Sequence, residues 1–191
     1  SFRPIVDAQV TAYQAHYPEA EFNVIYTPEQ KAINYILKDS SDLAIVSREL
    51  TEEEQKYYTQ RNLKYQPGKM AIDAVTFIVN NKNSRTSISM KELELILKGN
   101  ESTTKLVFDN SSSSNLNSML HKFNIVDVDK TNIFAAKGTL DVFDYVKKNE
   151  TAIGIIGLNW ISDVDDKNAM ALKNRVKVLG IQKGDMVIYP T

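Results

Sequence analysis

Hydrophobic and polar positions repeat along this chain with two periods, one typical of helices and one typical of strands. Residues 4–17 place apolar side chains at helical spacing, and Pro18 ends that stretch. EFNVIY at 21–26 alternates as a strand does, and DLAIVS at 42–47 is a short apolar run typical of a buried strand. Further helices are expected over 28–38, from Thr51 onward, over 89–97, from the serines at 111–114 to Phe123, over 139–148 and briefly from Leu158; further strands are expected over 69–80, 104–108, 132–136, 151–157 and 175–181.

This alternation of helices and strands predicts an α/β fold with mostly parallel sheets covered on both faces. The run at 69–80 is long and almost continuously apolar, so we expect an extended central strand there. The polar loop at 80–88 follows it and is the best domain boundary. We therefore predict a first lobe over 1–80, which is incomplete, and a second lobe over 81–191.

Composition narrows the class of protein. The 191 residues are 42% hydrophobic and 25% charged, as in ordinary globular domains. A net charge of −1 argues against a nucleic-acid partner, and no apolar run is long enough to span a membrane. The absence of cysteine excludes disulfides, thiolate zinc sites and cysteine nucleophiles within this chain.

Candidate chemistry gathers at three turns that connect a strand to a helix, where ligands of α/β sheets bind. These turns contain Thr27, then Ser47 with Arg48, and then the four serines at 111–114. Hydroxyl donors at the start of a helix suit a small oxyanion, because the N-terminal N–H groups there are unpaired and carry partial positive charge. Simpler interpretations remain open. The serines and Thr27 can be plain helix caps, and Arg48 can be a surface ion-pair partner of Glu49 or Glu52.

Asp109 has two open roles, since it can accept a proton from a ligand or only cap and orient the serine turn. Other polar residues give weaker signals. His121 lacks the orienting acid and the nucleophile elbow of a hydrolase, and Trp160 is expected to be a core residue. The carboxylates at 163–166 lack the spacing of a calcium loop, so a solvated helix start is the better interpretation.

Five segments of the chain carry recognisable motifs, and the order of these motifs along the chain is informative. They are DLAIVSREL (42–50), GKMAIDAVTFIVN (68–80), SISMKELELILKG (87–99), VFDNSSSSN (107–115) and ETAIGIIGLNWI (150–161). In this order the chain resembles the phosphate-binding (PstS-like) periplasmic substrate-binding proteins, which are the receptor components of phosphate ABC transporters.

The resemblance implies a type II periplasmic-binding fold, in which two lobes close like a hinge on a dehydrated oxyanion. It also implies export to the periplasm or cell surface, often with a lipid anchor on a removed N-terminal segment. The expected partners are phosphate or a similar oxyanion and an ABC transporter permease, with no cofactor, no metal and a monomeric state. Family members carry a strand before the first helix and a later segment that returns to the first lobe. Neither is found here, so the resemblance suggests a chain truncated at both ends.

Several positions depart from the family pattern. The family's Asp in the first-lobe turn falls on Ser47, its Arg in the anion loop falls on Val107, and glycines of that loop are replaced by Asn110 and Ser112. Arg48 can supply a guanidinium instead, since planar Arg donors suit oxyanions. The predicted ligand-binding residues are Ser1, Phe2, Thr27, Ser47, Arg48, Ser111, Ser112 and Ser113.

The function predicted from these residues is an extracytoplasmic binding protein that captures phosphate or a related oxyanion between its lobes for an ABC transporter. A ligand-sensing or regulatory domain of the same fold is the alternative. A phosphate-ester hydrolase is disfavoured, because the sequence offers no base, metal cluster or Walker-type loop.

Overall fold

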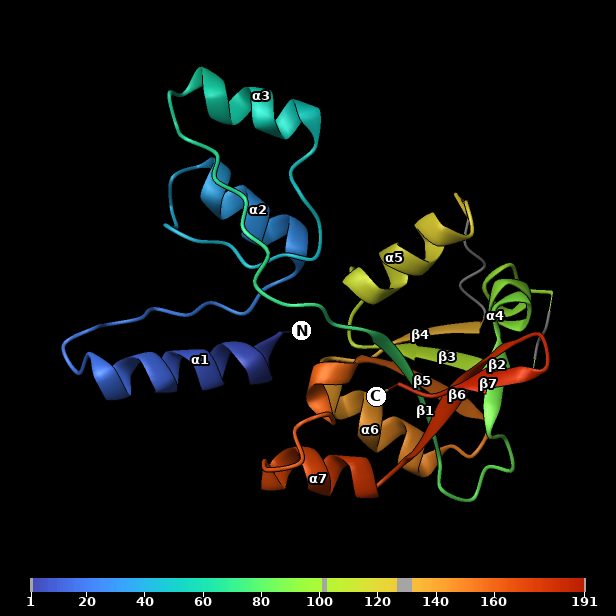
Figure 1. The fold of residues 1–191 in the computed structure, drawn as a ribbon. Helices are drawn as coiled ribbons and strands as arrows, with labels where there is room; N and C mark the ends of the chain where they lie inside the picture. The colour runs from blue at the N-terminus through green and yellow to red at the C-terminus, as the bar shows by residue number, and fades with distance from the viewer. Residues whose placement is uncertain (1, 101–102, 127–131, 191) are drawn as a thin grey trace.

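The computed structural model describes residues 2–100, 103–126 and 132–190. Its first helices, α1 (Arg3–His16), α2 (Glu29–Leu37) and α3 (Glu52–Gln60), lie beside a body that is built around one sheet (Figure 1). A segment without helix or strand leads from α3 into this body and enters the sheet as β1 (Val75–Val79). The elements that follow are β2 (Ser87–Ser89), α4 (Met90–Leu97), β3 (Lys105–Phe108), α5 (Ser114–Lys122), β4 (Ile133–Ala135), α6 (Thr139–Lys148), β5 (Ala152–Gly157), η2 (Leu158–Trp160), α7 (Lys167–Asn174), β6 (Lys177–Lys183) and β7 (Met186–Ile188).

Five of the seven strands in the described sheet run in the same direction. The order is β2–β6–β1–β5–β3–β4, and β7 pairs with β6 beside this path. Only β1 and β7 run against their neighbours, since β1 is antiparallel to both β5 and β6 and β7 is antiparallel to β6. The predicted α/β class with mostly parallel strands is therefore confirmed.

Hydrophobic side chains fill both faces of the sheet, because successive residues of a strand point to opposite sides. On β1, Phe77 and Val79 pack into one core, whereas Ile78 packs into the other. Leu93 of α4 belongs to the first core and Phe143 of α6 to the second. Helices thus cover both faces, as the sequence pattern predicts.

Gly154 lets α6 approach β5 closely. A Cβ atom at this position would lie 2.8 Å from side-chain carbons of Ile78, Val142 and Val146. Such a distance is too short for carbon atoms, so any larger residue would force the helix or the strand to move. Every residue of β5 is buried, which leaves little room for that movement.

Asn80 joins the end of β1 to the end of α6. Its Nδ2 donates to the carbonyl oxygens of Val146 at 3.2 Å and Lys147 at 2.7 Å, and its Oδ1 accepts from the N–H of Lys82 at 2.9 Å. The last carbonyls of a helix have no partner within the helix. Asn80 therefore caps a helix that lies far along the chain.

A second polar contact fixes the chain where it enters the sheet. The Oδ1 of Asp73 accepts from the N–H groups of Ala74 at 2.9 Å and Asn159 at 3.1 Å, while its Oδ2 accepts from Nδ2 of Asn159 at 2.5 Å. The N–H of Leu158 donates to the carbonyl of Ala74 at 2.8 Å. Gly157 makes room for this contact, since a Cβ there would lie 2.5 Å from both side chains.

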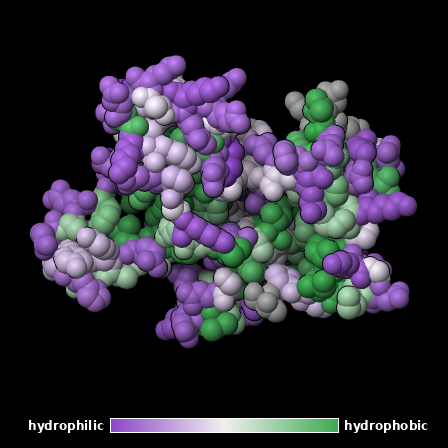
Figure 2. Space-filling view, turned by 45° about the horizontal axis from the view of Figure 1, so that its top comes forward, coloured by the Kyte–Doolittle hydropathy of each residue, from purple (hydrophilic) through white to green (hydrophobic). Residues whose placement is uncertain are grey.

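Two strands predicted in the N-terminal part are wrong. Residues 21–26 and 42–47 have the sequence pattern of strands but form neither strand nor helix. A strand needs a neighbour that satisfies its backbone groups, and the described residues before β1 contain none. Phe22, Ile25 and Leu43 consequently remain exposed, and Figure 2 shows hydrophobic surface in the middle of one face of the molecule.

The remaining elements agree with the prediction apart from their ends and a few omissions. The strand expected over 69–80 is confined to β1, although it lies inside the sheet as expected. The sequence pattern did not predict β2, and it predicted only the start of α7; β7 lies in the strand-like run near the C-terminus. The two lobes over 1–80 and 81–191 stay a prediction. Strand β1, from the first range, pairs with β5 and β6 from the second.

Among the described helices, none is long and apolar enough to cross a membrane.

Candidate functional site

Predicted site residues precede three helices that start toward the middle of the molecule. In the view of Figure 1, the first residues of α1, α2 and α5 lie at the helix ends that face this middle region. The first N–H groups of a helix favour an anion. Phe2 is the residue before α1, and its carbonyl accepts from the N–H of Val6 at 3.1 Å. Ser1 lies outside the described residues, so its role stays a prediction.

The serine turn connects β3 to α5, as predicted. Asn110 shapes it without left-handed backbone, because its Oδ1 accepts from the N–H of Ser112 at 2.8 Å and its carbonyl accepts from the N–H of Ser113 at 3.2 Å. This asparagine turn replaces the glycines of the family's loop. Helix α5 begins at Ser114, directly after the turn.

The serines of this turn differ in exposure. Ser111 and Ser112 are exposed, so their hydroxyls are open to a ligand. Ser113 is only 1% exposed, and its hydroxyl has no hydrogen-bond partner among the described residues. It is the residue before α5 but makes no side-chain cap, and Asp109 is buried at the base of the same turn. Plain capping therefore does not explain the buried hydroxyl of Ser113.

Thr27 does not cap α2, so that prediction is wrong. The helix begins at Glu29, its preceding residue is Pro28, and no side chain caps its start. The carbonyl of Pro28 accepts from the N–H groups of Lys31 and Ala32, which places the first turn one residue later than expected. Thr27 is partly buried just before the helix.

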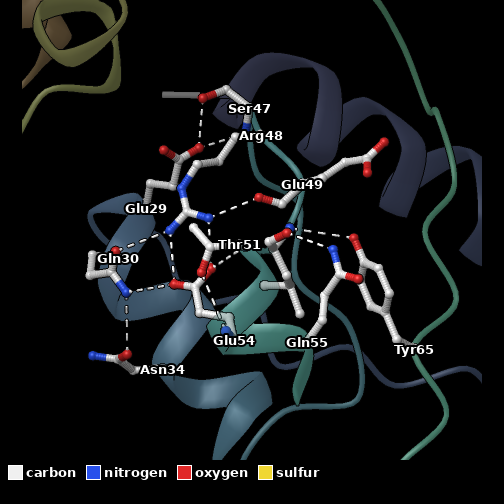
Figure 3. A network of polar contacts seen from close by, with 11 residues as sticks. Glu29, Gln30, Asn34, Ser47, Arg48, Glu49, Thr51, Glu54, Gln55 and Tyr65 are labelled. Carbon is white, nitrogen blue, oxygen red and sulfur yellow. Dashed lines mark hydrogen bonds and ion pairs between the residues drawn. The ribbon is translucent and has the colours of Figure 1, made fainter. Parts of the chain in front are cut away.

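Ser47 already holds a carboxylate. Its N–H and its Oγ both donate to Oε1 of Glu29, each at 2.6 Å (Figure 3). Ser47 comes from the turn after the segment 42–46, and Glu29 is the first residue of α2. The pair thus joins this turn to the start of α2, and its two donors are those predicted for an oxyanion.

Arg48 points to Glu54 of α3. Its Nη1 lies 2.8 Å from Oε2 and its Nη2 lies 2.9 Å from Oε1 of that carboxylate, and Gln30 accepts from the guanidinium at 3.2 Å (Figure 3). The hydrogen bond from Arg48 is the main cause that lowers the pKa of Glu54 from 4.5 to about 2, against an opposing effect of burial. The pKa of Arg48 is raised, chiefly by the same bond. The alternative interpretation of Arg48 was a surface ion pair with Glu49 or Glu52. Arg48 does form an ion pair, but its partner is Glu54.

Glu54 also completes the predicted start of α3. Its side chain accepts from the N–H of Thr51 at 2.8 Å, and its own N–H donates to the hydroxyl of Thr51 at 3.3 Å. This reciprocal capping box confirms the helix start read from the sequence. One carboxylate therefore serves both the helix start and Arg48.

The other polar candidates occupy structural positions. His121 is exposed on α5, and Trp160 packs against the core beside α6, as expected. Asp166 caps α7 by accepting from the N–H of Asn168 at 2.8 Å, which confirms a helix start at 163–166. No cluster of potential metal ligands was found among the described residues.

The structure brings Ser47, Arg48 and the start of α2 together, but it leaves them separate from the serine turn. Within the described part of the chain, neither Ser47 nor Arg48 hydrogen-bonds with residues 111–113. Sequence reasoning missed Glu29, which it treated only as part of a helix start. An acidic residue directly after Thr-Pro at a predicted site was the available signal.

Comparisons with known proteins show which family the chain belongs to. A model of the PBP superfamily domain matches residues 1–190. The chain belongs to the PBP superfamily. Its relatives in this superfamily include the phosphate-binding protein PstS 2 of Streptococcus pneumoniae, which is 28% identical over 103 residues that cover 54% of this chain and 33% of the relative. PstS of Staphylococcus saprophyticus is 30% identical over 142 residues, covering 69% of this chain and 44% of the relative.

Two solved structures from other organisms share the fold of this chain. A substrate-binding protein from Clostridium perfringens, assigned to a phosphate ABC transporter and holding bound phosphate, has a TM-score of 0.75 at 18% identity and covers 95% of this chain and 72% of its own. An ABC-type phosphate transport receptor from Vibrio cholerae has a TM-score of 0.63 at 23% identity, with 95% and 73% covered. The resemblance and the type II fold predicted from the sequence are confirmed. The chain spans about a third to about half the length of the curated relatives it matches.

Proposed function

We propose that this chain is the phosphate-binding part of an extracytoplasmic substrate-binding protein that serves an ABC transporter. The observation that carries the proposal is the serine turn of a PBP-superfamily chain, where exposed Ser111 and Ser112 precede the start of α5. Neutral hydroxyls and helix N–H groups bind an oxyanion without a counter-charge. The matched relatives are named as phosphate-binding proteins, which supports binding rather than catalysis.

The ligand would lie between the serine turn and the first-lobe residues. Phe2, Thr27 and Ser47 are the described candidates on the first-lobe side, and Ser1 is a further candidate there. Arg48 contributes positive charge nearby, although its guanidinium is held by Glu54. We extend the proposal to a monomer at the periplasm or cell surface, held by a lipid anchor, with a transporter permease as its partner.

The test is a calorimetric titration of phosphate into the full-length protein after unfolding and refolding to remove bound anion, with sulfate as the comparison ligand. We expect micromolar or tighter phosphate binding, because three or four charge-assisted hydrogen bonds of roughly 1.5–3 kcal/mol each exceed the usual costs of closure and desolvation. Ser111→Ala combined with Ser112→Ala should weaken phosphate binding at least about tenfold.

Ser118→Ala is the matched control, since Ser118 is exposed on the same helix but lies beyond its first turn. Its affinity should equal that of the unmodified protein. Absence of binding of both anions by a folded, full-length protein would overturn the phosphate assignment. If the double variant and the control lost equal phosphate affinity, the serine turn would not be part of the binding site.

A further inference from the structure

Glu29 occupies the donors through which Ser47 would bind an oxyanion. One oxygen of its carboxylate accepts both from the N–H and from the hydroxyl of Ser47, each at 2.6 Å (Figure 3). Short bonds between neutral donors and an ionised acceptor are roughly twice as strong as neutral ones. Geometrically, Oε1 of Glu29 is bound as one oxygen of an external oxyanion would be.

The position of this contact leaves it open to competition. Ser47 is exposed and Glu29 is only partly buried, so an anion from solvent can reach both groups. The start of α2 favours the negative charge of Glu29. Arg48, the adjacent cation, is engaged by Glu54 and Gln30 and makes no hydrogen bond to Glu29.

We propose that Glu29 is an internal competitor of the ligand, whose carboxylate holds the Ser47 donors until an incoming oxyanion displaces it. This inference rests on the function proposed above and adds an affinity-determining residue to that site. A protein whose binding-competent state is only partly populated binds with reduced apparent affinity. The contact between Glu29 and Ser47 therefore lowers the affinity of the site for every oxyanion that uses these donors.

The decisive variants are Glu29→Gln, which removes the charge, and Glu29→Asp, which keeps the charge but shortens the side chain by one methylene. Each is titrated with phosphate and with sulfate as full-length protein refolded free of anion, with circular dichroism as a check of folding. We expect both variants to bind phosphate at least about fivefold more tightly, because the glutamine can offer Ser47 only a neutral acceptor and the shorter aspartate no longer reaches its donors. Sulfate binding should tighten by a similar factor.

Glu53→Gln is the matched control, because Glu53 is an exposed acid in the first turn of α3 and the change removes the same charge. Its affinity should stay unchanged. A nuclear magnetic resonance spectrum adds a direct readout: the amide signal of Ser47 should shift on addition of phosphate and should already be shifted in Glu29→Asp.

Each contrary result has a distinct meaning. If both Glu29 variants bind phosphate with unchanged affinity while the unmodified protein binds normally, Glu29 is not an internal competitor. The proposed function stays intact in that case. Weaker phosphate binding in Glu29→Gln with sulfate binding preserved also overturns it, and shows that Glu29 contacts the ligand and accepts its proton. Absence of phosphate and sulfate binding in every form overturns both proposals together.

Discussion

The carboxylate of Asp73 accepts hydrogen bonds from both the backbone N–H and the side-chain amide of Asn159. Asp73 lies in the segment that enters the sheet, and Asn159 lies in η2, directly after β5. Because the N–H of Leu158 also donates to the carbonyl of Ala74, the entering chain is tied to the end of β5 at three points. These contacts set the direction in which the chain from α3 reaches β1.

Replacing Asp73 by Ala should destabilise the sheet body moderately. The change leaves the N–H and Nδ2 of Asn159 without their acceptor, at a cost of about 1 kcal/mol because these groups are partly open to water. Urea unfolding followed by the fluorescence of Trp160 measures the effect, since this tryptophan is the last residue of η2 and packs against the core. Asp42→Ala, at an exposed site, is the control and should change the unfolding free energy by less than about 0.5 kcal/mol. Equal effects of the two changes would contradict the role of Asp73.

Gly154→Ala should lower the unfolding free energy by about 1–3 kcal/mol, because the added Cβ overlaps Ile78, Val142 and Val146. Gly68→Ala is a matched control, since a Cβ there meets no atom within 4 Å. Adding Val142→Ala to Gly154→Ala should cost less than the sum of the two single changes, because the shortened side chain relieves the overlap. If the losses of unfolding free energy were additive, the overlap with Val142 would not be the cause of the destabilisation by Gly154→Ala.

Asn80→Ala should cost about 1–3 kcal/mol of unfolding free energy, as it leaves two carbonyls at the end of α6 without their donor in a buried place. Asn81→Ala provides the comparison, since Asn81 makes a single exposed bond to the carbonyl of Asn174. The same urea experiment applies. A loss no larger than that of the Asn81 variant would argue against a capping role.

Acid should release the contact between Arg48 and Glu54. The pKa of Glu54 is about 2 in the folded protein against an ordinary 4.5, so the pair stabilises the fold fully above pH 4.5. This contribution is lost as the pH falls from 4.5 toward 2, because the unfolded chain takes up the proton first. Carboxyl resonances should show Glu54 titrating near pH 2, and the pKa should rise toward 4.5 in Arg48→Ala.

The control for this titration is Lys56→Ala, which removes an exposed cation of α3 that forms no ion pair with Glu54. The pKa of Glu54 should stay low in that variant. A pKa near 4.5 in the unmodified protein would show that the guanidinium and the carboxylate are not in contact in solution.

The sequence predicted the sheet body better than the N-terminal part, and strand pairing explains the difference. The strands at 104–108 and 151–157 formed where predicted, because each has a neighbour with which to exchange hydrogen bonds. The runs at 21–26 and 42–47 have equally good patterns but no neighbouring strand among the described residues. A hydrophobic pattern shows which face of a strand can be buried, but it does not provide the pairing partner.

Local signals predicted the parts of the site that depend on nearby residues. The capping box of Thr51 and Glu54 and the serine turn before α5 were both predictable from spacing alone. The contact between Ser47 and Glu29 joins residues eighteen positions apart, for which the sequence holds no periodic signal. Arg48 shows a related difficulty, since several acids follow it and only the folded turn selects Glu54.

The antiparallel placement of β1 has a consequence for the order in which the protein folds. Val75–Val79 pairs with residues 153–157 on one side and with residues 177–179 on the other, so its partners are synthesised only after most of the chain. During synthesis at about 5–20 residues per second, this apolar strand must wait for several seconds or longer without them. The growing chain therefore exposes this apolar strand before the sheet can close around it, which makes the segment a natural point of contact for chaperones.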